Sequence, residues 1–453
     1  MSNLKLLMRL LLNFLTLTVI IILIFIGFGL PIISGYGAKV LCSDVFVSGR
    51  NAEEVIKNDL SVFPFNLGHY HISYTDSSVK ATVFGMALKI AKYRKGFGAA
   101  LIYPSSTNKS VRKEWNEFNE KDKNSPWPYG EAVDSGIEIK DTSFQNIVRY
   151  CFENRYQTRA LLIIKSGKII FEKYATGISA DTRLAGWSMA KSITNALLGI
   201  LVKDRLLDTA ARPVFPEWKA DSRSQISLSD MMHMSSGLQW LEMYEGPSDI
   251  TRMLFRENDM AGYALKKHAV YPAGKTFEYS SGTANLLSLK MRMILGDAAY
   301  YEFPYKKLFG KIGMNHTLLE TDGSGTFVSS SFCYATARDF GRFGLLYLND
   351  GKWNGEEILP KGWVKFSTNT VPERYDKRWG NYGALWWVNK GDSKSFRKRR
   401  YPNVPDDCFS AMGYEGQSIW IIPSRQTVVV RLSNEHYDKL DGNKLLEGIC
   451  NLR

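Results

Sequence analysis

The longest apolar run of the chain lies near its start. Residues 10–33 read LLLNFLTLTVIIILIFIGFGLPII, and this run contains no charged side chain. A helix needs about 20 apolar residues to cross a hydrocarbon core, whereas the apolar core of a signal peptide has about 7–15. The run therefore predicts a retained transmembrane anchor, with a cleaved signal sequence ending near residues 35–38 as the alternative. Either interpretation places the rest of the chain outside the cytoplasm.

Two later segments have the pattern of β-hairpins. Residues 160–172 contain two β-branched runs around Ser166-Gly167, and residues 418–432 contain two such runs around residues 423–425. The pattern between these segments is mostly helical. If both hairpins join one antiparallel sheet, the helices must pack on its faces, and we expect an α/β fold.

Changes of composition divide the chain into three predicted parts. Residues 1–36 would be a cytoplasmic tip and the transmembrane anchor. Residues 37–140 would be an N-terminal extension that includes a charged linker at 105–124. Residues 141–453 contain both hairpins and the helical middle, and we expect them to form the main domain.

Charge and cysteine content narrow the classes of partner and cofactor. The net charge of +13 favours an anionic partner such as lipid head groups, and the basic run at 394–400 is one candidate contact. No nucleic-acid-binding motif accompanies this charge, so we predict no nucleic acid partner. The five cysteines form no CxxC pair, so we predict no zinc site and no cofactor, while one or two disulfides stay open.

A serine and a lysine stand together where an apolar helix is predicted to begin. The segment GWSMAKSITNALL places Ser188 in the first turn and Lys191 three residues later, on the same helix face. Free backbone N–H groups at a helix start stabilise an oxyanion, and burial with the helix dipole lowers the pKa of a lysine. Lys191 can therefore take the proton of the Ser188 hydroxyl. A capping serine beside a solvated lysine is the structural alternative.

The segment Gly186-x-Ser188-x-Ala190 also approaches the nucleophile elbow of hydrolases that use a histidine as base. Such a triad needs a downstream histidine, and the candidates are His233, His268, His316 and His436. None of them stands in a distinctive local motif.

Three motifs together resemble the serine β-lactamase-like superfamily. They are Ser188-Met-Ala-Lys191, then Tyr279-Ser-Ser281 after Pro272-Ala-Gly274, and then Gly413-Tyr-Glu-Gly-Gln417 before the last hairpin. The resemblance covers residues 141–453 and is greatest to the branch of class C β-lactamases, esterases, D-aminopeptidases and nylon-oligomer hydrolases. It implies an antiparallel sheet built from strands of both ends of the domain, with helices on both faces and a helical subdomain.

The resemblance also implies roles for individual residues. Ser188 would be the acylated nucleophile, Lys191 its proton acceptor and Tyr279 the proton donor to the leaving group. The backbone N–H groups of Ser188 and Gln417 would form the oxyanion hole. Ser281 and Gly416 would complete the substrate-binding side of the site.

Two departures from the family pattern bear on the substrate. Ser281 stands where β-lactamases carry an asparagine, and Tyr414 stands where they carry a lysine that binds a substrate carboxylate. We therefore expect amide or ester hydrolysis of a small molecule or short peptide, by a single-pass protein with its domain on the periplasmic or extracellular side. A D-alanyl peptidase or carboxypeptidase is one alternative. A non-catalytic member that binds a peptide or cell-wall fragment is another.

Overall fold

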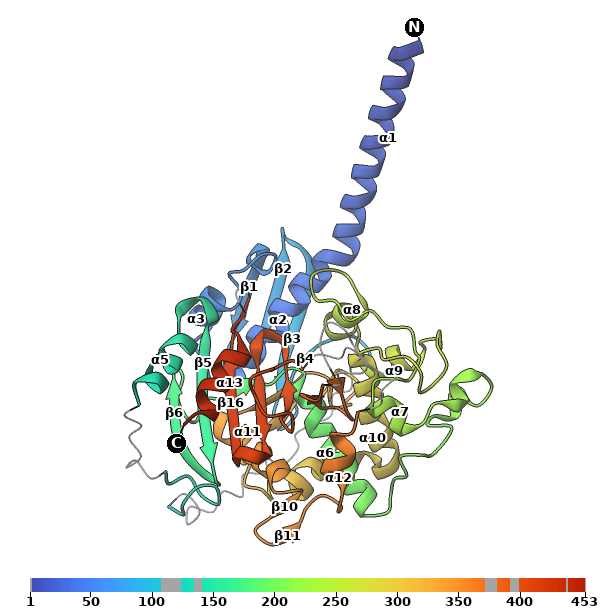
Figure 1. Ribbon diagram of the computed structural model, residues 1–453. Helices are drawn as coiled ribbons and strands as arrows, with labels where there is room; N and C mark the ends of the chain where they lie inside the picture. The colour runs from blue at the N-terminus through green and yellow to red at the C-terminus, as the bar shows by residue number, and fades with distance from the viewer. Residues whose placement is uncertain are drawn as a thin grey trace.

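The computed structural model describes residues 2–106, 124–133, 141–370, 381–391, 399–436 and 439–452. The predicted linker at 105–124 and the basic run at 394–400 lie largely outside the described residues. One long helix projects from a body of layered sheets and helices (Figure 1).

Helices and strands follow one another in groups along the chain. The α-helices are α1 (Ser2–Ile24), α2 (Leu30–Phe46), α3 (Ala52–Asn58), α5 (Thr142–Cys151), α6 (Met189–Lys203), α7 (Leu228–Met232), α8 (Asp249–Arg256), α9 (Met260–Leu265), α10 (Ser281–Pro304), α11 (Ala337–Leu348), α12 (Trp363–Ser367) and α13 (Gly442–Cys450). The strands are β1 (Gly68–Ser73), β2 (Ser78–Val83), β3 (Met86–Arg94), β4 (Gly98–Leu101), β5 (Thr158–Lys165), β6 (Lys168–Tyr174), β7 (Leu184–Ala185), β8 (Leu318–Leu319), β9 (Cys333–Ala335), β10 (Lys352–Trp353), β11 (Glu356–Glu357), β12 (Asn381–Tyr382), β13 (Trp387–Val388), β14 (Phe409–Met412), β15 (Ser418–Ile422) and β16 (Thr427–Ser433). The π-helical turn η1 (Phe25–Gly29) joins α1 to α2.

Both predicted hairpins are confirmed, and they join one sheet. The seven-stranded sheet has the order β12-β13-β14-β15-β16-β5-β6, and all its pairs are antiparallel. β16 pairs with β5 with Val430 opposite Leu162, which brings the end of the domain beside its beginning. Ser166 and Gly167 make the turn between β5 and β6 with φ angles of 49° and 78°.

The two faces of this sheet are covered by different helices. Leu161 and Ile163 of β5 pack in a cluster with residues of α5 and α13, whereas Leu162 and Ile164 belong to the main core. α11 contacts β5, β15 and β16 on the core side. Because neighbouring side chains on a strand point to opposite faces, a strand covered on both faces is apolar at consecutive positions. This confirms the predicted α/β fold with helices on both faces.

The N-terminal part of the body is a second, four-stranded sheet, with the order β1-β2-β3-β4, and α2 lies against it. α2 is the direct continuation of the apolar N-terminal helix (Figure 1). Its residues from Leu30 to Asp44 are buried, apart from a partly exposed Pro31. The sequence boundary predicted at residue 36 therefore falls inside a helix of the core.

The apolar N-terminal run is a candidate membrane span by length and composition. The helix over Lys5–Phe46 is long and apolar enough to cross a bilayer, and its most apolar window is not buried in the body. A signal sequence at this position passes the same test. Leu30 and Ile33, at the end of the uncharged run, are instead 1% and 3% exposed within the body.

A buried ion pair ties α2 to the rest of the chain. Lys39 Nζ lies 2.5 Å from Glu320 Oε2, and both side chains are almost completely buried. Glu320 also accepts hydrogen bonds from the Ser43 hydroxyl at 3.0 Å and from the Ala99 backbone N–H at 2.7 Å. Each buried charge is thus compensated by partners from another part of the chain.

We predict that Lys39→Met destabilises the protein by about 3–5 kcal/mol, because it leaves the Glu320 carboxylate buried without a cation. The measurement is the free energy of unfolding in denaturant. The double variant Lys39→Met/Glu320→Gln removes both charges and should lose less than the sum of the two single variants. Additive losses would contradict this interpretation of the pair.

Candidate active site

Ser188 lies at the start of α6, as the sequence predicted. Its φ and ψ angles are −63° and −6°, and its side chain makes no capping hydrogen bond. The preceding Trp187 has a φ of 47°, which is an uncommon left-handed conformation for a tryptophan. This turn leads from β7 into the helix, and it leaves the half-buried Ser188 hydroxyl available to other partners.

Lys191 is buried, with 1% of its surface exposed, and its amine meets three oxygen atoms. Nζ lies 2.9 Å from Ser188 Oγ, 3.0 Å from Ser281 Oγ and 2.9 Å from the backbone oxygen of Ser330. Burial lowers the pKa of Lys191 to about 8, although the charge of Glu242 acts in the opposite direction. Near neutral pH the neutral fraction of this amine is therefore much larger than that of an exposed lysine.

Tyr279 and Ser281 flank the residue that caps α10. The Ser280 side chain accepts a hydrogen bond from the Thr283 N–H at 3.0 Å and so starts the helix. The ring of Tyr279 lies 4.8 Å from Lys191 Nζ and stacks on Trp387 at 5.4 Å. Burial, then the Glu242 charge, raises the pKa of Tyr279 well above its usual value, and a hydrogen bond with Ser188 lowers it in part. Tyr279 is therefore a protonated phenol and can donate a proton.

Glu242 is a site residue that the sequence analysis missed. Its Oε1 accepts a hydrogen bond from Ser281 Oγ at 2.5 Å, and its Oε2 accepts from the Ser281 backbone N–H at 2.9 Å. The Trp240 indole N–H also donates to Oε2, at 2.5 Å. Glu242 stands in the segment between α7 and α8, where no regular pattern of residues marks it.

These contacts decide which way the Lys191 amine points when it is neutral. A neutral amine has two N–H bonds and one lone pair. The Ser330 carbonyl can only accept, and Ser281 accepts as well because its proton goes to Glu242. Both N–H bonds are thereby used, so the lone pair faces the hydroxyl of Ser188. This is the orientation that a general base for Ser188 requires.

The third motif packs against the turn before Ser188. A Cβ atom on Gly413 would lie 2.2 Å from the backbone oxygen of Gly186, so only glycine allows this approach. Gly416 has a φ of 82°. Gln417 is buried, and its side-chain amide bonds to the backbone of Ser433 in both directions, at 2.6 and 3.1 Å. The motif thus adjoins the Ser188 turn, as the predicted oxyanion hole requires.

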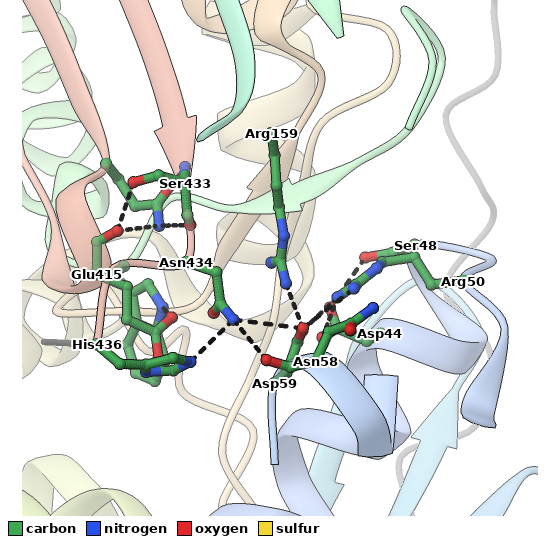
Figure 2. A network of polar contacts seen from close by, with 12 residues as sticks. Asp44, Ser48, Arg50, Asn58, Asp59, Arg159, Glu415, Ser433, Asn434 and His436 are labelled. Carbon is green, nitrogen blue, oxygen red and sulfur yellow. Dashed lines mark hydrogen bonds and ion pairs between the residues drawn. The ribbon is translucent and has the colours of Figure 1, made fainter. Parts of the chain in front are cut away.

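Glu415, within this motif, links it to α2 and to the turn before Ser188. Its carboxylate accepts a hydrogen bond from the Tyr36 hydroxyl of α2 at 3.0 Å and one from the Trp187 indole N–H at 3.1 Å. Burial raises the pKa of Glu415 to about 7. Figure 2 shows Glu415 at the edge of a polar network in which Asp59 joins Arg159 to the N-terminal region.

Tyr414 of the third motif lies among aromatic side chains. Tyr414 stacks on Tyr244 with ring centroids 4.5 Å apart, and it meets the edge of Trp187 at 5.3 Å. Trp387 also reaches the site, through its contact with Tyr279, whereas Trp386 is completely buried in the core.

Among the described residues, no histidine contacts Ser188 as the triad alternative requires. In the described part of the chain, Ser188 has Lys191 and Tyr279 as side-chain partners and no histidine. His233 Nδ1 lies 2.8 Å from the Ser229 backbone oxygen, and His436 Nε2 lies 2.9 Å from Asn434 Nδ2.

Cysteines and acidic residues do not form a second chemical centre among the described residues. All five cysteines are free thiols, and no group of three or more potential ligands could hold a metal ion. The disulfides that the sequence left open do not form. The described side chains that meet at the site are those of Ser188, Lys191, Tyr279, Ser281 and Glu242.

Comparison with known proteins identifies the family and the fold of the domain that carries these residues. A family model described as Beta-lactamase matches residues 144–448. The 6-aminohexanoate-dimer hydrolase of Paenarthrobacter ureafaciens is 24% identical over 324 residues, which are 64% of this chain and 77% of that protein. A penicillin-binding protein homologue from Caulobacter crescentus has a similar fold, with a TM-score of 0.53 and 14% identity over 68% of this chain and 96% of that one.

The orientation of Lys191 gives a prediction for the dependence of rate on pH. The neutral amine is the active base, so kcat/KM should rise with pH through a midpoint near 8. Glu242→Gln removes a charge that favours the ammonium form and should move this midpoint to lower pH. The measurement is kcat/KM for a chromogenic ester across pH. Glu245→Gln, an exposed neighbour on the same segment, serves as the control. An unchanged midpoint in Glu242→Gln would contradict the proposed coupling.

Proposed function

The chain belongs to the β-lactamase family, and we propose that this serine hydrolase cleaves amide or ester bonds through an acyl-enzyme on Ser188. The observation that carries the proposal is the buried Lys191 amine, 2.9 Å from the Ser188 hydroxyl. A serine hydroxyl is a weak nucleophile, and an adjacent base with a lowered pKa activates it.

The reaction follows from the positions of three side chains. Ser188 Oγ attacks the carbonyl carbon of the substrate while its proton passes to Lys191. The backbone N–H groups of Ser188 and Gln417 stabilise the oxyanion that forms. Tyr279 protonates the leaving amine or alcohol and recovers its proton from Lys191. Water then cleaves the acyl-enzyme by the same route in reverse.

We infer that the substrate has an uncharged acyl part. The position of the carboxylate-binding lysine is occupied by Tyr414, whose ring lies on Tyr244. This aromatic wall favours apolar groups, and no charge on it compensates a carboxylate. The name of the Paenarthrobacter relative, a 6-aminohexanoate-dimer hydrolase, supports an amide as the bond that is cleaved.

The apolar helix favours a membrane-anchored enzyme with its body on the periplasmic or extracellular side. A signal-peptide cut near residues 35–38 would fall inside α2, where Tyr36 and Ala38 are 3% and 0% exposed. Such a cut would also remove Tyr36 from Glu415. These contacts support retention of the helix.

A member of the fold that only binds a peptide or cell-wall fragment is the second candidate, and a D-alanyl peptidase is a third. A protein that only binds its ligand would not need the pKa of Lys191 to be lowered. Labelling by a covalent serine probe distinguishes the proposed amidase or esterase from the binding protein. Activity on short D-amides distinguishes it from the D-alanyl peptidase.

We predict that Ser188→Ala is folded and inactive. The hydroxyl makes no capping bond, so the free energy of unfolding should change by less than about 1 kcal/mol. Lys191→Met should lower kcat by about 10²–10⁴-fold, because it removes the base while filling the same volume. The measurements are ester and amide turnover and labelling by a fluorophosphonate probe. Full activity in Ser188→Ala would refute the mechanism.

Tyr414 gives a prediction for selectivity. Tyr414→Lys should raise the preference for substrates with a carboxylate about 10- to 100-fold, because a charge-assisted hydrogen bond contributes about 1.5–3 kcal/mol. The measurement is the ratio of kcat/KM for matched substrates with and without the carboxylate. Tyr414→Met loses the same aromatic stacking without adding charge and is the control. A strong preference for carboxylates in the native enzyme would show that another residue binds them.

A further inference from the structure

The membrane helix enters the body without a linker. α1, η1 and α2 form one continuous helical stretch, and Leu30 is already 1% exposed. Arg9 is the last charge before the apolar run. From Leu10, a helix rising about 1.5 Å per residue covers the roughly 30 Å of a hydrocarbon core in about 20 residues. The outer boundary of the hydrocarbon then falls near Gly29, so the body must lie directly on the membrane surface.

The turn between β2 and β3 lies at this same level. Val83, the last residue of β2, packs in one cluster with Leu30 and Ile33, and the Ser34 hydroxyl donates to the Ala87 carbonyl at 2.6 Å. Figure 1 shows the tip of β2 beside the base of α1. The residues that form the turn therefore face the boundary of the hydrocarbon.

This turn exposes apolar side chains. Phe84 is 65% exposed, Met86 is 43% exposed and Leu88 is 58% exposed. Phe63, in the loop whose Phe65 joins the same cluster, is 71% exposed. Adjacent exposed apolar side chains mark an interaction surface, and here they continue the apolar surface of α1.

Two cations stand beside the same boundary. The Arg256 guanidinium lies 5.0 Å from the ring centroid of Phe28, and its Nη1, which is buried, has no hydrogen-bond partner among the described residues. Lys89 follows the exposed turn, and burial and then the charge of Arg256 lower its pKa. Glu257 is the acidic neighbour of both, but it already pairs with Arg252 at 2.8 Å. This arrangement suits the phosphate of an anionic lipid.

We propose that Phe84 and Met86 insert into the membrane at the level where α1 leaves it, while Arg256 and Lys89 bind lipid phosphates. This membrane-contact surface holds the body in one orientation on the bilayer. It rests on α1 as a membrane span and is independent of the chemistry at Ser188.

The test uses the full chain in phosphatidylcholine nanodiscs with and without phosphatidylglycerol. A spin label is placed at Phe84→Cys in a Cys450→Ser background, since the other cysteines are buried. Asn354→Cys, an exposed position in the β10–β11 turn, is the aqueous control, and Leu17→Cys in α1 is the membrane reference. We expect the ratio of accessibility to oxygen over a water-soluble nickel complex to be several-fold higher at position 84 than at position 354.

Two further outcomes decide the proposal. Phosphatidylglycerol should deepen the label at position 84, and Arg256→Gln should abolish this change, while Arg425→Gln, at an exposed position between β15 and β16, should keep it. A label at position 84 as aqueous as that at 354, with position 17 inside the membrane, would overturn the membrane-contact surface. An aqueous label at position 17 would overturn its premise, and hydrolysis by Ser188 would stand in either case.

Discussion

The removal of the Lys191 amine from water is the constraint on which the site depends. A lone buried amine is costly unless polar atoms surround it, and its partners here come from three separate segments: the start of α6, the start of α10 and the loop before β9. These three segments must therefore come together for this side chain to be accommodated. The same burial that demands these partners makes the amine a usable base.

The sequence was sufficient where local pattern determines structure. Alternating and β-branched runs located the two hairpins, because a strand repeats every two residues whatever it packs against. The spacing of Ser188 and Lys191 placed both on one helix face, because residues three apart are neighbours on a helix surface. Their catalytic roles stay a prediction, although the observed contact brings the two side chains together.

Two features could not be read from the pattern, for different reasons. Glu242 lies in an irregular segment, and its contact with Ser281 spans 39 residues of chain, which no local periodicity records. The point at which the apolar helix enters the body was hidden, because hydrophobicity measures only exclusion from water. Lipid and a protein core satisfy that equally, so Leu10–Phe28 and Leu30–Ile33 look alike in sequence although the latter packs in protein.

The ion pair between Lys39 and Glu320 also constrains the order in which the protein can be completed. The carboxylate that compensates Lys39 follows it by 281 residues along the chain. The partner of Tyr36 is still more distant along the chain, since Glu415 is 379 residues away. Contacts between such distant parts of a chain form slowly. α2 can pack early against the four-stranded sheet that follows it, but its contacts with Glu320 and Glu415 can form only after those residues have been synthesised.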